Sequence, residues 1–240
     1  MSNSIAQYID HAVLHPTQTH EDLGAACMLC DRVGTASICV KPSMVSRAAE
    51  LLADSSVKVS TVIGFPHGGT STAAKAAEAE KACQDGALEL DMVVNIGLAL
   101  AGDYAFIEED IRQVVAVATK HKAIVKVIFE TGLLENESQK IELCGCSERA
   151  GADFVKTSTG FGFVKAADGS LASTGATRDD IRLMREHFSR GVKASGGIRS
   201  LSDARAFVEM GASRLGTSST ESLVQEEQGN ETSAESNTGY

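Results

Sequence analysis

The sequence predicts an α/β protein built as a single (β/α)8 TIM barrel, and three observations lead to this fold class. Short apolar, β-branched segments alternate with longer amphipathic or alanine-rich segments along the chain. About eight such pairs fit into the 240 residues, and barrels of this type are typically ~250 residues long. In four places a glycine separates a helical segment from the next strand: Val33–Thr35, Asp85–Ala87, Ala150–Ala152 and Met210–Ala212. Glycine ends helices in the left-handed conformation, and repeated strand–helix units of this length join parallel strands.

Each expected element follows from its residue pattern. Strands are marked by short apolar runs rich in β-branched residues: Tyr8–Val13, Ala36–Val40, Lys58–Gly64, Ala87–Asn95, Ala123–Glu130, Asp153–Ser158, Val192–Ser195 and Ser213–Gly216. Helices are marked by the amphipathic runs between them: Glu21–Arg32, Ser43–Ala53, Thr72–Gln84, Tyr104–His121, Glu137–Ala150, Arg178–Phe188 and Ser202–Met210, with an eighth left open near Glu221–Glu226. A doubly wound open sheet is the alternative arrangement of these elements.

One barrel domain is expected over residues 1–224, because no change in composition indicates a second domain. The last segment, residues 225–240, is polar, acidic and poor in apolar residues. This composition predicts a mobile C-terminal tail. Its final residue, Tyr240, is an apolar exception within it.

Charge and cysteine usage restrict the class of partner and the compartment. The formal net charge of −10 argues against a nucleic acid or an anionic membrane as the main partner. No signal peptide or membrane-spanning apolar run is evident, so we expect a cytoplasmic protein with reduced thiols. Cys27 and Cys30 have CxxC spacing, but they lie in an apolar helical run without a second pair. This favours packed thiols over a redox or metal role. The six histidines show no ligand pattern, so no metal is expected.

Charged residues occupy the middle of consecutive predicted strands. Successive side chains of a strand face opposite sides, so in a barrel one set contacts the helices and the other fills the lumen. Leu90 and Met92 then face the helices, and Asp91 faces the lumen. The same phase in the other strands directs six side chains into one lumen: Asp10, Cys39, Asp91, Lys126, Lys156 and Lys193. The alternative is that each charge is isolated at a strand end and reaches solvent. A lysine in the middle of each of three consecutive strands is less easily explained in this way.

Lys156 and Lys193 on neighbouring strands predict an amine with a lowered pKa. Two ammonium groups ~5 Å apart at an effective dielectric of ~20 repel by ~3 kcal/mol. This repulsion lowers one lysine pKa by ~2 units, and burial lowers it further. A free amine among apolar walls attacks carbonyl carbons and forms an iminium, which accepts electrons from a breaking bond. The nearby carboxylate of Asp91 is suited to relay protons, through water, to and from a substrate.

Three glycine-containing segments predict a phosphate site. Gly196 and Gly197 follow the seventh expected strand, and Gly216–Ser219 follows the eighth. Loops after these two strands commonly bind phosphate in such barrels, because glycines allow close approach and helix N-termini supply N–H donors. Ser158–Gly160 adds a third loop after the sixth strand. No GxGxxG or GK[ST] nucleotide-binding motif accompanies them.

Two motifs in the same chain, FVKTSTGF and VKASGGIR, make the sequence similar to a known family. With YIDHAVLHPT, SICVKPSMV, KVIFETGLL and MGASRLGTSS, the chain resembles the deoxyribose-phosphate aldolases over residues 5–224. These are class I aldolases on (β/α)8 barrels. The resemblance implies reversible cleavage of 2-deoxy-D-ribose 5-phosphate to D-glyceraldehyde 3-phosphate and acetaldehyde. It implies no metal or organic cofactor, small phosphorylated sugars and short aldehydes as partners, and a monomer or homodimer.

The resemblance also assigns roles to individual residues. Lys156 would form the Schiff base, Lys193 would lower its pKa, and Asp91 would relay protons. The substrate would be lined by Asp10, Cys39, Lys126 and Thr159, with Tyr240 as a further contact from the tail. Its phosphate would be bound by Gly160, Gly196, Gly197, Gly216, Ser218 and Ser219.

The chain departs from the family pattern in the first strand, just after each of the first two strands, and in one longer loop. Ala12 stands where a threonine is usual, and His15 and Lys41 also differ. The segment 162–177 is longer than its counterparts and is expected to rim the site. Two other functions stay open at this stage: another Schiff-base phosphosugar lyase or isomerase, and a non-catalytic phosphosugar-binding barrel.

Overall fold

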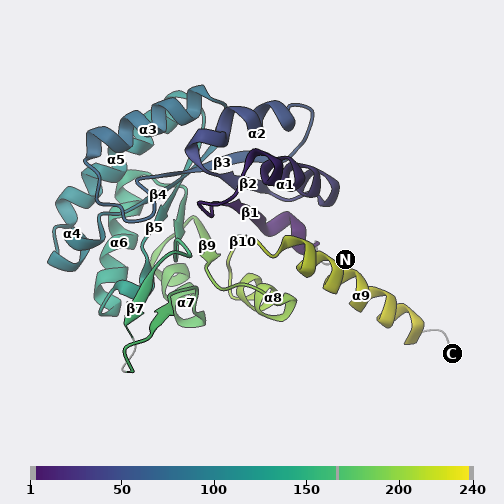
Figure 1. The fold of residues 1–240 in the computed structure, drawn as a ribbon. Coiled ribbons are helices and arrows are strands. Elements are labelled where there is room, and N and C mark those ends of the chain that lie inside the picture. The colour runs from purple at the N-terminus through teal and green to yellow at the C-terminus, as the bar shows by residue number, and fades with distance from the viewer. Residues whose placement is uncertain (1–3, 166–167, 238–240) are drawn as a thin grey trace.

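Eight parallel strands close into a barrel in the part of the chain that the computed structural model describes, residues 4–165 and 168–237, with side chains as far as residue 229 (Figure 1). The strands are β1 (Ile9–Val13), β2 (Ser37–Val40), β3 (Lys58–Ile63), β4 (Glu89–Val93), β5 (Ile124–Ile128), β6 (Phe154–Lys156), β9 (Gly191–Ser195) and β10 (Arg214–Thr217). Around the barrel the order is β1-β10-β9-β6-β5-β4-β3-β2. The predicted TIM barrel is therefore confirmed, and the open sheet is wrong because β1 pairs with both β2 and β10.

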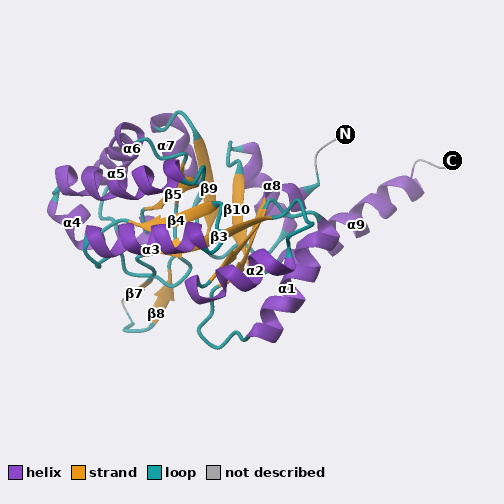
Figure 2. Ribbon diagram, turned by 90° about the horizontal axis from the view of Figure 1, so that it is seen from above, coloured by secondary structure: helices purple, strands orange, loops and turns teal. Residues whose placement is uncertain are grey.

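Helices follow the strands and surround the barrel (Figure 2). They are α1 (His20–Val33), α2 (Val45–Leu51), α3 (Thr72–Gln84), α4 (Ile96–Ala101), α5 (Tyr104–Lys120), α6 (Glu137–Ala150), α7 (Arg178–His187), α8 (Leu201–Glu209) and α9 (Thr220–Asn237). Short 3-10 turns cover Ile5–Tyr8, Pro42–Met44 and Thr131–Leu133. Among the described residues, no helix is both long and apolar enough to cross a membrane.

The glycines between helices and strands have the backbone conformation that the sequence predicts. Gly34 ends α1 with a φ of 72°, and Gly151 ends α6 with a φ of 88°. Both lie in the left-handed region, which costs a residue without a Cβ atom little. At the other end of α1, Thr19 and Asp22 form a capping box, in which each side chain accepts a hydrogen bond from the other's backbone N–H. Helix boundaries are thus encoded locally.

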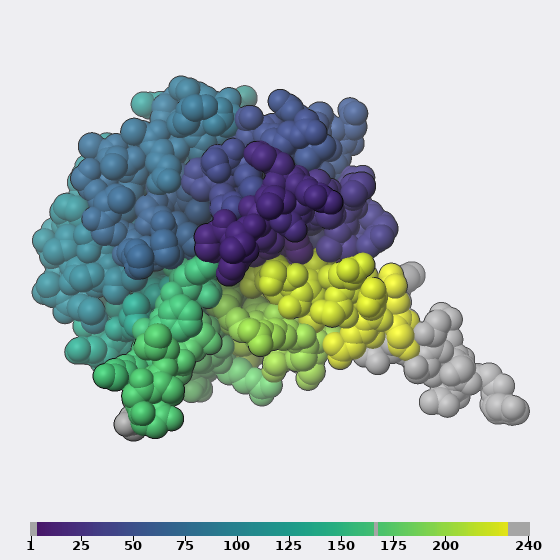
Figure 3. Space-filling view, in the orientation of Figure 1, coloured from purple at the N-terminus to yellow at the C-terminus, as the bar shows by residue number. Residues whose placement is uncertain are grey.

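Two elements differ from the expected pattern. Helix α4 was not expected, because its six apolar and glycine residues read as a continuation of the strand before it; Asn95 caps it by accepting a hydrogen bond from the N–H of Leu98. The long segment 162–177 contains a hairpin of two antiparallel strands, β7 (Phe163–Lys165) and β8 (Leu171–Ser173). This hairpin projects from the barrel surface, as the green segment in Figure 3 shows.

Helix α9 extends through the start of the segment for which the sequence predicts a tail. The expected helix near Glu221–Glu226 is part of a longer one that ends at Asn237 and points away from the barrel (Figure 1). Glu227 is buried and accepts hydrogen bonds from the N–H of Ile5 and the hydroxyl of Ser4. Packing against the first turn of the chain therefore orders α9 beyond residue 224. The mobility of residues 225–240 stays a prediction, and Tyr240 lies outside the described residues.

Apolar side chains fill the space between the barrel and the helices. Ile38, Leu90, Met92 and Val127 are completely buried there. Cys27 and Cys30 belong to this layer, and burial raises the pKa of their thiols to about 11 and about 12. Thiols that are protonated at neutral pH are poor nucleophiles and poor metal ligands, so this pair contributes packing. The apolar side chains of the strands thus face the helices, and the buried charged side chains of the strands face the lumen.

His11 joins the barrel to the last helix. It is buried on the helix-facing side of β1, and its Nδ1 lies 2.8 Å from the hydroxyl oxygen of Thr220, the first residue of α9. Burial lowers the pKa of His11 from 6.5 to about 4, so the folded protein holds it as a neutral imidazole at neutral pH.

This neutral histidine predicts a loss of stability in mild acid. The folded pKa lies below the unfolded value, so the contribution of His11 is complete above pH 6.5 and disappears as the pH falls to about 4. At about 1.4 kcal/mol per pKa unit, the free energy of unfolding should fall by about 3 kcal/mol over this range. Urea denaturation across the range should show a correspondingly smaller fall for His11→Gln. An identical pH dependence in the variant would contradict the assignment.

Candidate functional site

The carboxylate of Asp91 is shared by three lysines in the lumen. Its Oδ2 lies 2.8 Å from the Nζ of Lys156 and 2.8 Å from the Nζ of Lys193. Its Oδ1 lies 2.9 Å from the Nζ of Lys126. The strand register explains this meeting point, because Asp91 is paired with Lys126 across β4 and β5, and Lys156 with Lys193 across β6 and β9. All four side chains are almost completely buried.

A second group of charges lies beside the first, toward the amino ends of the strands. Asp10 contacts Lys193 and lies 3.1 Å from the Nζ of Lys126. Glu89 lies 2.6 Å from the same Nζ. Arg214 donates to both carboxylate oxygens of Glu89, at 2.9 and 3.0 Å, and also to Asp10. Every carboxylate in the lumen therefore contacts at least two cations.

Counting these charges singles out Lys156. The described lumen holds three carboxylates, Asp10, Glu89 and Asp91, and four basic groups, Lys126, Lys156, Lys193 and Arg214. Lys126, Lys193 and Arg214 each contact two or three carboxylate groups, whereas Lys156 contacts Asp91 alone. A buried cluster is costly unless its charges balance. The cluster is neutral when Lys156 is the group without a proton.

The pKa directions agree with this balance. Burial lowers the pKa of Lys156 and the charge of Lys193 lowers it further; the attraction of Asp91, which two other lysines share, does not reverse the shift. Burial acts in the same direction on Lys193, but the carboxylates of Asp10 and Asp91 outweigh it and raise its pKa. For Lys126 the same two carboxylates and Glu89 also outweigh burial, so its pKa rises well above the usual range. Burial is thus a larger cause of the lowered pKa of Lys156 than the lysine–lysine repulsion that the sequence predicts.

A pocket of about 500 Å³ opens above this cluster at the carboxyl ends of the strands. Lys156 and Lys193 line its base together with Asp10 and Cys39. Its volume lies within the range of small-molecule sites, and this end of a (β/α)8 barrel is where such sites occur. Lys156 is therefore a buried amine that faces a cavity able to hold a small substrate.

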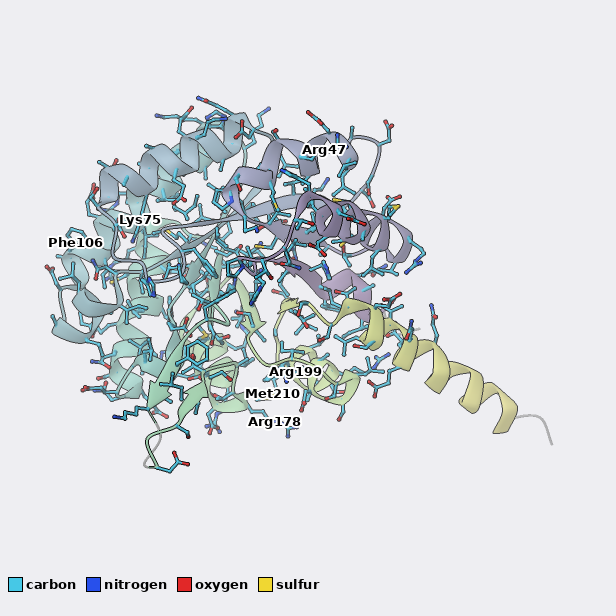
Figure 4. The ribbon with its side chains drawn as sticks, in the orientation of Figure 1. Arg47, Lys75, Phe106, Arg178, Arg199 and Met210 are labelled. Atoms are coloured by element: carbon cyan, nitrogen blue, oxygen red, sulfur yellow. The ribbon has the colours of Figure 1, made fainter. Side chains whose placement is uncertain are left out.

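The glycine loops form the opposite wall of this pocket. All six of the predicted phosphate residues line it: Gly160, Gly196, Gly197, Gly216, Ser218 and Ser219. Gly196 and Gly197 have φ values of 89° and 79°, and the next helix, α8, begins at Leu201. A Cβ atom on Gly216 would lie 2.7 Å from the Cβ of Ser195, so strands β10 and β9 are too close at this point for a side chain on Gly216. Backbone N–H groups, the starts of α8 and α9 and the exposed Arg199, which lies just before α8 (Figure 4), give this wall a positive character.

Some predicted site residues line the pocket and others lie beneath it. Thr159 lines it, as do Ala12 and His15 at two of the positions that depart from the family pattern. Lys126 and Asp91 do not, because the lysines above them fill the lumen. Lys41 lies at the edge, where its Nζ donates to the carbonyl of Gln18 at 2.7 Å.

Several residues of the site were missed by sequence reasoning. Glu89 and Arg214 stand at the first positions of β4 and β10, where a charge ordinarily reaches solvent. Phe161 and Phe163 line the pocket, and the hairpin strand β7 begins at Phe163. The alternation of side chains along β4 already placed Glu89 on the lumen face, which is the signal that could have found it.

Glu130 is a further residue that the sequence did not single out. It is buried at the end of β5 in a left-handed conformation, with a φ of 55°, which is costly for a residue with a side chain. Its carboxylate accepts hydrogen bonds from the N–H of Thr159 at 3.0 Å, from the Thr159 hydroxyl and from the Thr174 hydroxyl at 2.9 Å. One carboxylate thus connects β5, the Thr159 loop and the far end of the hairpin.

The described residues contain no group of three or more histidine, cysteine, aspartate or glutamate side chains arranged to hold a metal ion. The lumen carboxylates are instead occupied by lysine and arginine side chains. Such carboxylates and amines in contact are suited to proton transfer and to nucleophilic attack by an amine.

Comparison with known proteins assigns the chain to a family. The family model described as DeoC/LacD family aldolase matches residues 4–219, which include the whole barrel. The chain belongs to this family.

Individual deoxyribose-phosphate aldolases are similar to this chain over most of their length. The deoxyribose-phosphate aldolase of Carboxydothermus hydrogenoformans is 49% identical over 93% of this chain and 95% of its own. That of Streptococcus mutans is 46% identical over 94% and 98%. Among solved structures, the tetrameric deoxyribose phosphate aldolase from Aeropyrum pernix has a TM-score of 0.84 at 31% identity, over 93% of this chain and 91% of its own.

The bonds of Glu130 predict a graded loss of stability. Glu130→Leu leaves one N–H and two hydroxyls without their buried acceptor, at about 1 kcal/mol or more each, so the free energy of unfolding should fall by about 3 kcal/mol. Thr174→Val removes one of these bonds and should cost about 1 kcal/mol. Denaturant unfolding of both variants measures the difference. Equal losses would show that the Thr159 bonds contribute nothing.

Proposed function

We propose that this protein is a class I aldolase that reversibly cleaves 2-deoxy-D-ribose 5-phosphate to D-glyceraldehyde 3-phosphate and acetaldehyde through an iminium on Lys156. The observation that carries the proposal is the charge balance of the lumen: Lys156 is the one described basic group there that contacts a single carboxylate, and it shares that carboxylate, Asp91, with two other lysines. The lysine faces a pocket with glycine loops at the other wall. The deoxyribose-phosphate aldolases that are 49% and 46% identical to this chain support the choice of substrate.

The bond changes follow from the reactivity of an amine with an aldehyde. The free amine of Lys156 adds to C1 of the open-chain sugar, and loss of water gives the iminium. A base removes the proton of the C3 hydroxyl, the C2–C3 bond breaks, and its electrons move into the iminium to give an enamine. D-glyceraldehyde 3-phosphate leaves. Protonation of the enamine at C2 and addition of water then release acetaldehyde and the free amine.

Asp91 and Lys193 have complementary roles in this scheme. Asp91 lies within hydrogen-bond distance of the Lys156 amine, so it relays protons, through water, between the amine and the substrate. Lys193 contacts the same carboxylate oxygen and supplies a positive charge beside the amine. This charge disfavours the ammonium form of Lys156. It also stabilises the negative charge that develops on the C3 oxygen as its proton is removed. Asp10, Cys39 and Thr159 contact the sugar, and Lys126 holds Asp91 in position from below.

The phosphate loops determine how the substrate lies. The six glycine and serine residues of these loops bind the 5-phosphate, which directs C1 of the sugar toward Lys156. The free energy gained by binding the phosphate offsets the entropy lost when the sugar is held in one orientation. The reaction needs no metal or organic cofactor. We further propose a cytoplasmic monomer or homodimer, whereas the related aldolase from Aeropyrum pernix is a tetramer.

The Schiff base predicts a covalent adduct on one residue. When the protein is incubated with acetaldehyde and sodium borohydride, mass spectrometry of a digest should find an ethyl group on Lys156 and loss of activity. Lys156→Arg should abolish both the adduct and retro-aldol turnover. Lys58→Arg, an exposed lysine at the start of β3, serves as the control. An active protein without an adduct on Lys156 would refute the mechanism. Replacing acetaldehyde by dihydroxyacetone tests whether the donor is specific.

Removal of the Lys193 charge predicts a change in the pH profile. The free amine of Lys156 forms as the pH rises through its pKa, which the positive charge of Lys193 helps to lower. Lys193→Leu should therefore move the acid limb of the kcat/KM profile to higher pH by about one to two units. Lys58→Leu removes an equal charge from the exterior and should leave the limb in place. An unchanged limb in Lys193→Leu would show that Lys193 does not perturb the amine.

A further inference from the structure

Arg214 and Glu89 form an ion pair below the pocket that the proposed reaction does not use directly. They are the first residues of β10 and β4, and neither lines the pocket. The guanidinium makes two hydrogen bonds to the Glu89 carboxylate, at 2.9 and 3.0 Å, and lies over the ring of Phe154, 5.7 Å from its centre. Glu89 is buried, and only 16% of the Arg214 side chain is exposed. Burying such a pair is expensive, and well-packed apolar residues would often be as stable.

We propose that Arg214 and Glu89 are positioning residues that keep the lumen around Lys156 at zero net charge, and that this balance sets the pH above which Lys156 is a free amine. The proposal rests on Lys156 being the nucleophile of the proposed aldolase. It adds a specific role for two residues that do not touch the substrate. We refer to the pair as the Arg214–Glu89 floor.

Two chains of contacts connect this floor to Lys156. Along the first, Arg214 contacts Asp10, Asp10 contacts Lys193, and Lys193 shares the Asp91 carboxylate with Lys156. Along the second, Glu89 lies 2.6 Å from Lys126, which lies 2.9 Å from Asp91. Removal of either member of the floor therefore leaves an unmatched charge within the network that ends at the amine.

The charge balance includes the groups that enter the lumen around Lys156 from the other strands of the barrel. Those with charge are Asp10 from β1, Glu89 and Asp91 from β4, Lys126 from β5, Lys193 from β9 and Arg214 from β10. Strand β2 adds the thiol of Cys39, whose pKa burial raises, and β3 adds the hydroxyl of Ser60. His15 and Arg199 lie at the mouth of the pocket. Apart from Lys156, the charged groups of this lumen cluster are three cations, Lys126, Lys193 and Arg214, and three anions, Asp10, Glu89 and Asp91.

The two members of the floor should have opposite effects. Arg214→Met leaves the lumen with one excess negative charge, which favours the ammonium form of Lys156. Glu89→Gln leaves one excess positive charge, which favours the free amine. A unit charge on the order of 10 Å away, at an effective dielectric of ~20, shifts the midpoint by about one pH unit. The double variant restores the balance and should return the midpoint to that of the wild-type protein.

The experiment measures the protonation of Lys156 without turnover. The rate of single-turnover trapping by acetaldehyde and cyanoborohydride is recorded against pH, with the adduct located by mass spectrometry. We expect the midpoint to rise by about one unit in Arg214→Met, to fall by about one unit in Glu89→Gln, and to return in the double variant. Arg214→Lys keeps the charge and should leave the midpoint in place. Arg149→Met and Glu108→Gln, which change the same charges in a pair outside the barrel between α6 and α5, should not shift it.

The outcomes separate this proposal from the proposed function. If the adduct forms on Lys156 but the single variants shift the midpoint in the same direction, or not at all, the charge balance is refuted and the aldolase stands. If the wild-type protein gives no adduct on Lys156, the proposed function fails first. If Arg214→Met does not fold, Glu89→Gln and the double variant still decide, because a merely structural pair would not give a lowered midpoint that the second substitution reverses.

Discussion

The sharing of one buried carboxylate among three lysines is the interaction on which the site depends. Asp91 contacts Lys126, Lys156 and Lys193 within 2.9 Å, in a lumen where none of these groups reaches water freely. One carboxylate cannot fully compensate three ammonium groups. Lys126 and Lys193 have a second carboxylate in Asp10, whereas Lys156 has only its share of Asp91, so Lys156 is the lysine of the three whose pKa is lowered. The cost of burying these charges is accordingly not a defect of the fold. The buried cluster keeps an amine with a lowered pKa at the base of the pocket.

Barrel geometry makes this sharing possible, because strands far apart in the chain bring one side chain each to a common centre. Asp10 and Lys193 are 183 residues apart in sequence and in direct contact. Their strands both pair with β10, which lies between them, and this pairing sets their register: Asp10 lies opposite Gly216, and Lys193 lies opposite Arg214. The same geometry places the glycine loops and the helix starts at one end of the barrel, so the glycine loops and the Lys156 amine face one pocket.

The sequence predicted those features that depend on local patterns and on strand alternation. Asp91, Lys156 and Lys193 were identified because a charge in the middle of an apolar strand has few explanations. Arg214 was missed because its contacts with Glu89 and Asp10 depend on which strands become neighbours when the barrel closes, which alternation alone does not specify. Glu130 was missed because its left-handed backbone has no signature in a sequence where glycine is the usual sign. The hairpin of 162–177 was only a long loop, since three-residue strands carry little periodic signal.

The two ends of that hairpin lie close together, and this has a consequence for how the family can vary. The N–H of Thr174 donates to the carbonyl of Gly162 at 2.9 Å, and Glu130 holds Thr159 and Thr174 from the barrel side. A segment whose ends are joined in this way can be lengthened or shortened without moving either end, because closing a longer loop costs only slightly more entropy. The mouth of the pocket is thereby a replaceable module. Different hairpins can be grafted between Gly162 and Thr174 while the charges of the lumen stay in their places.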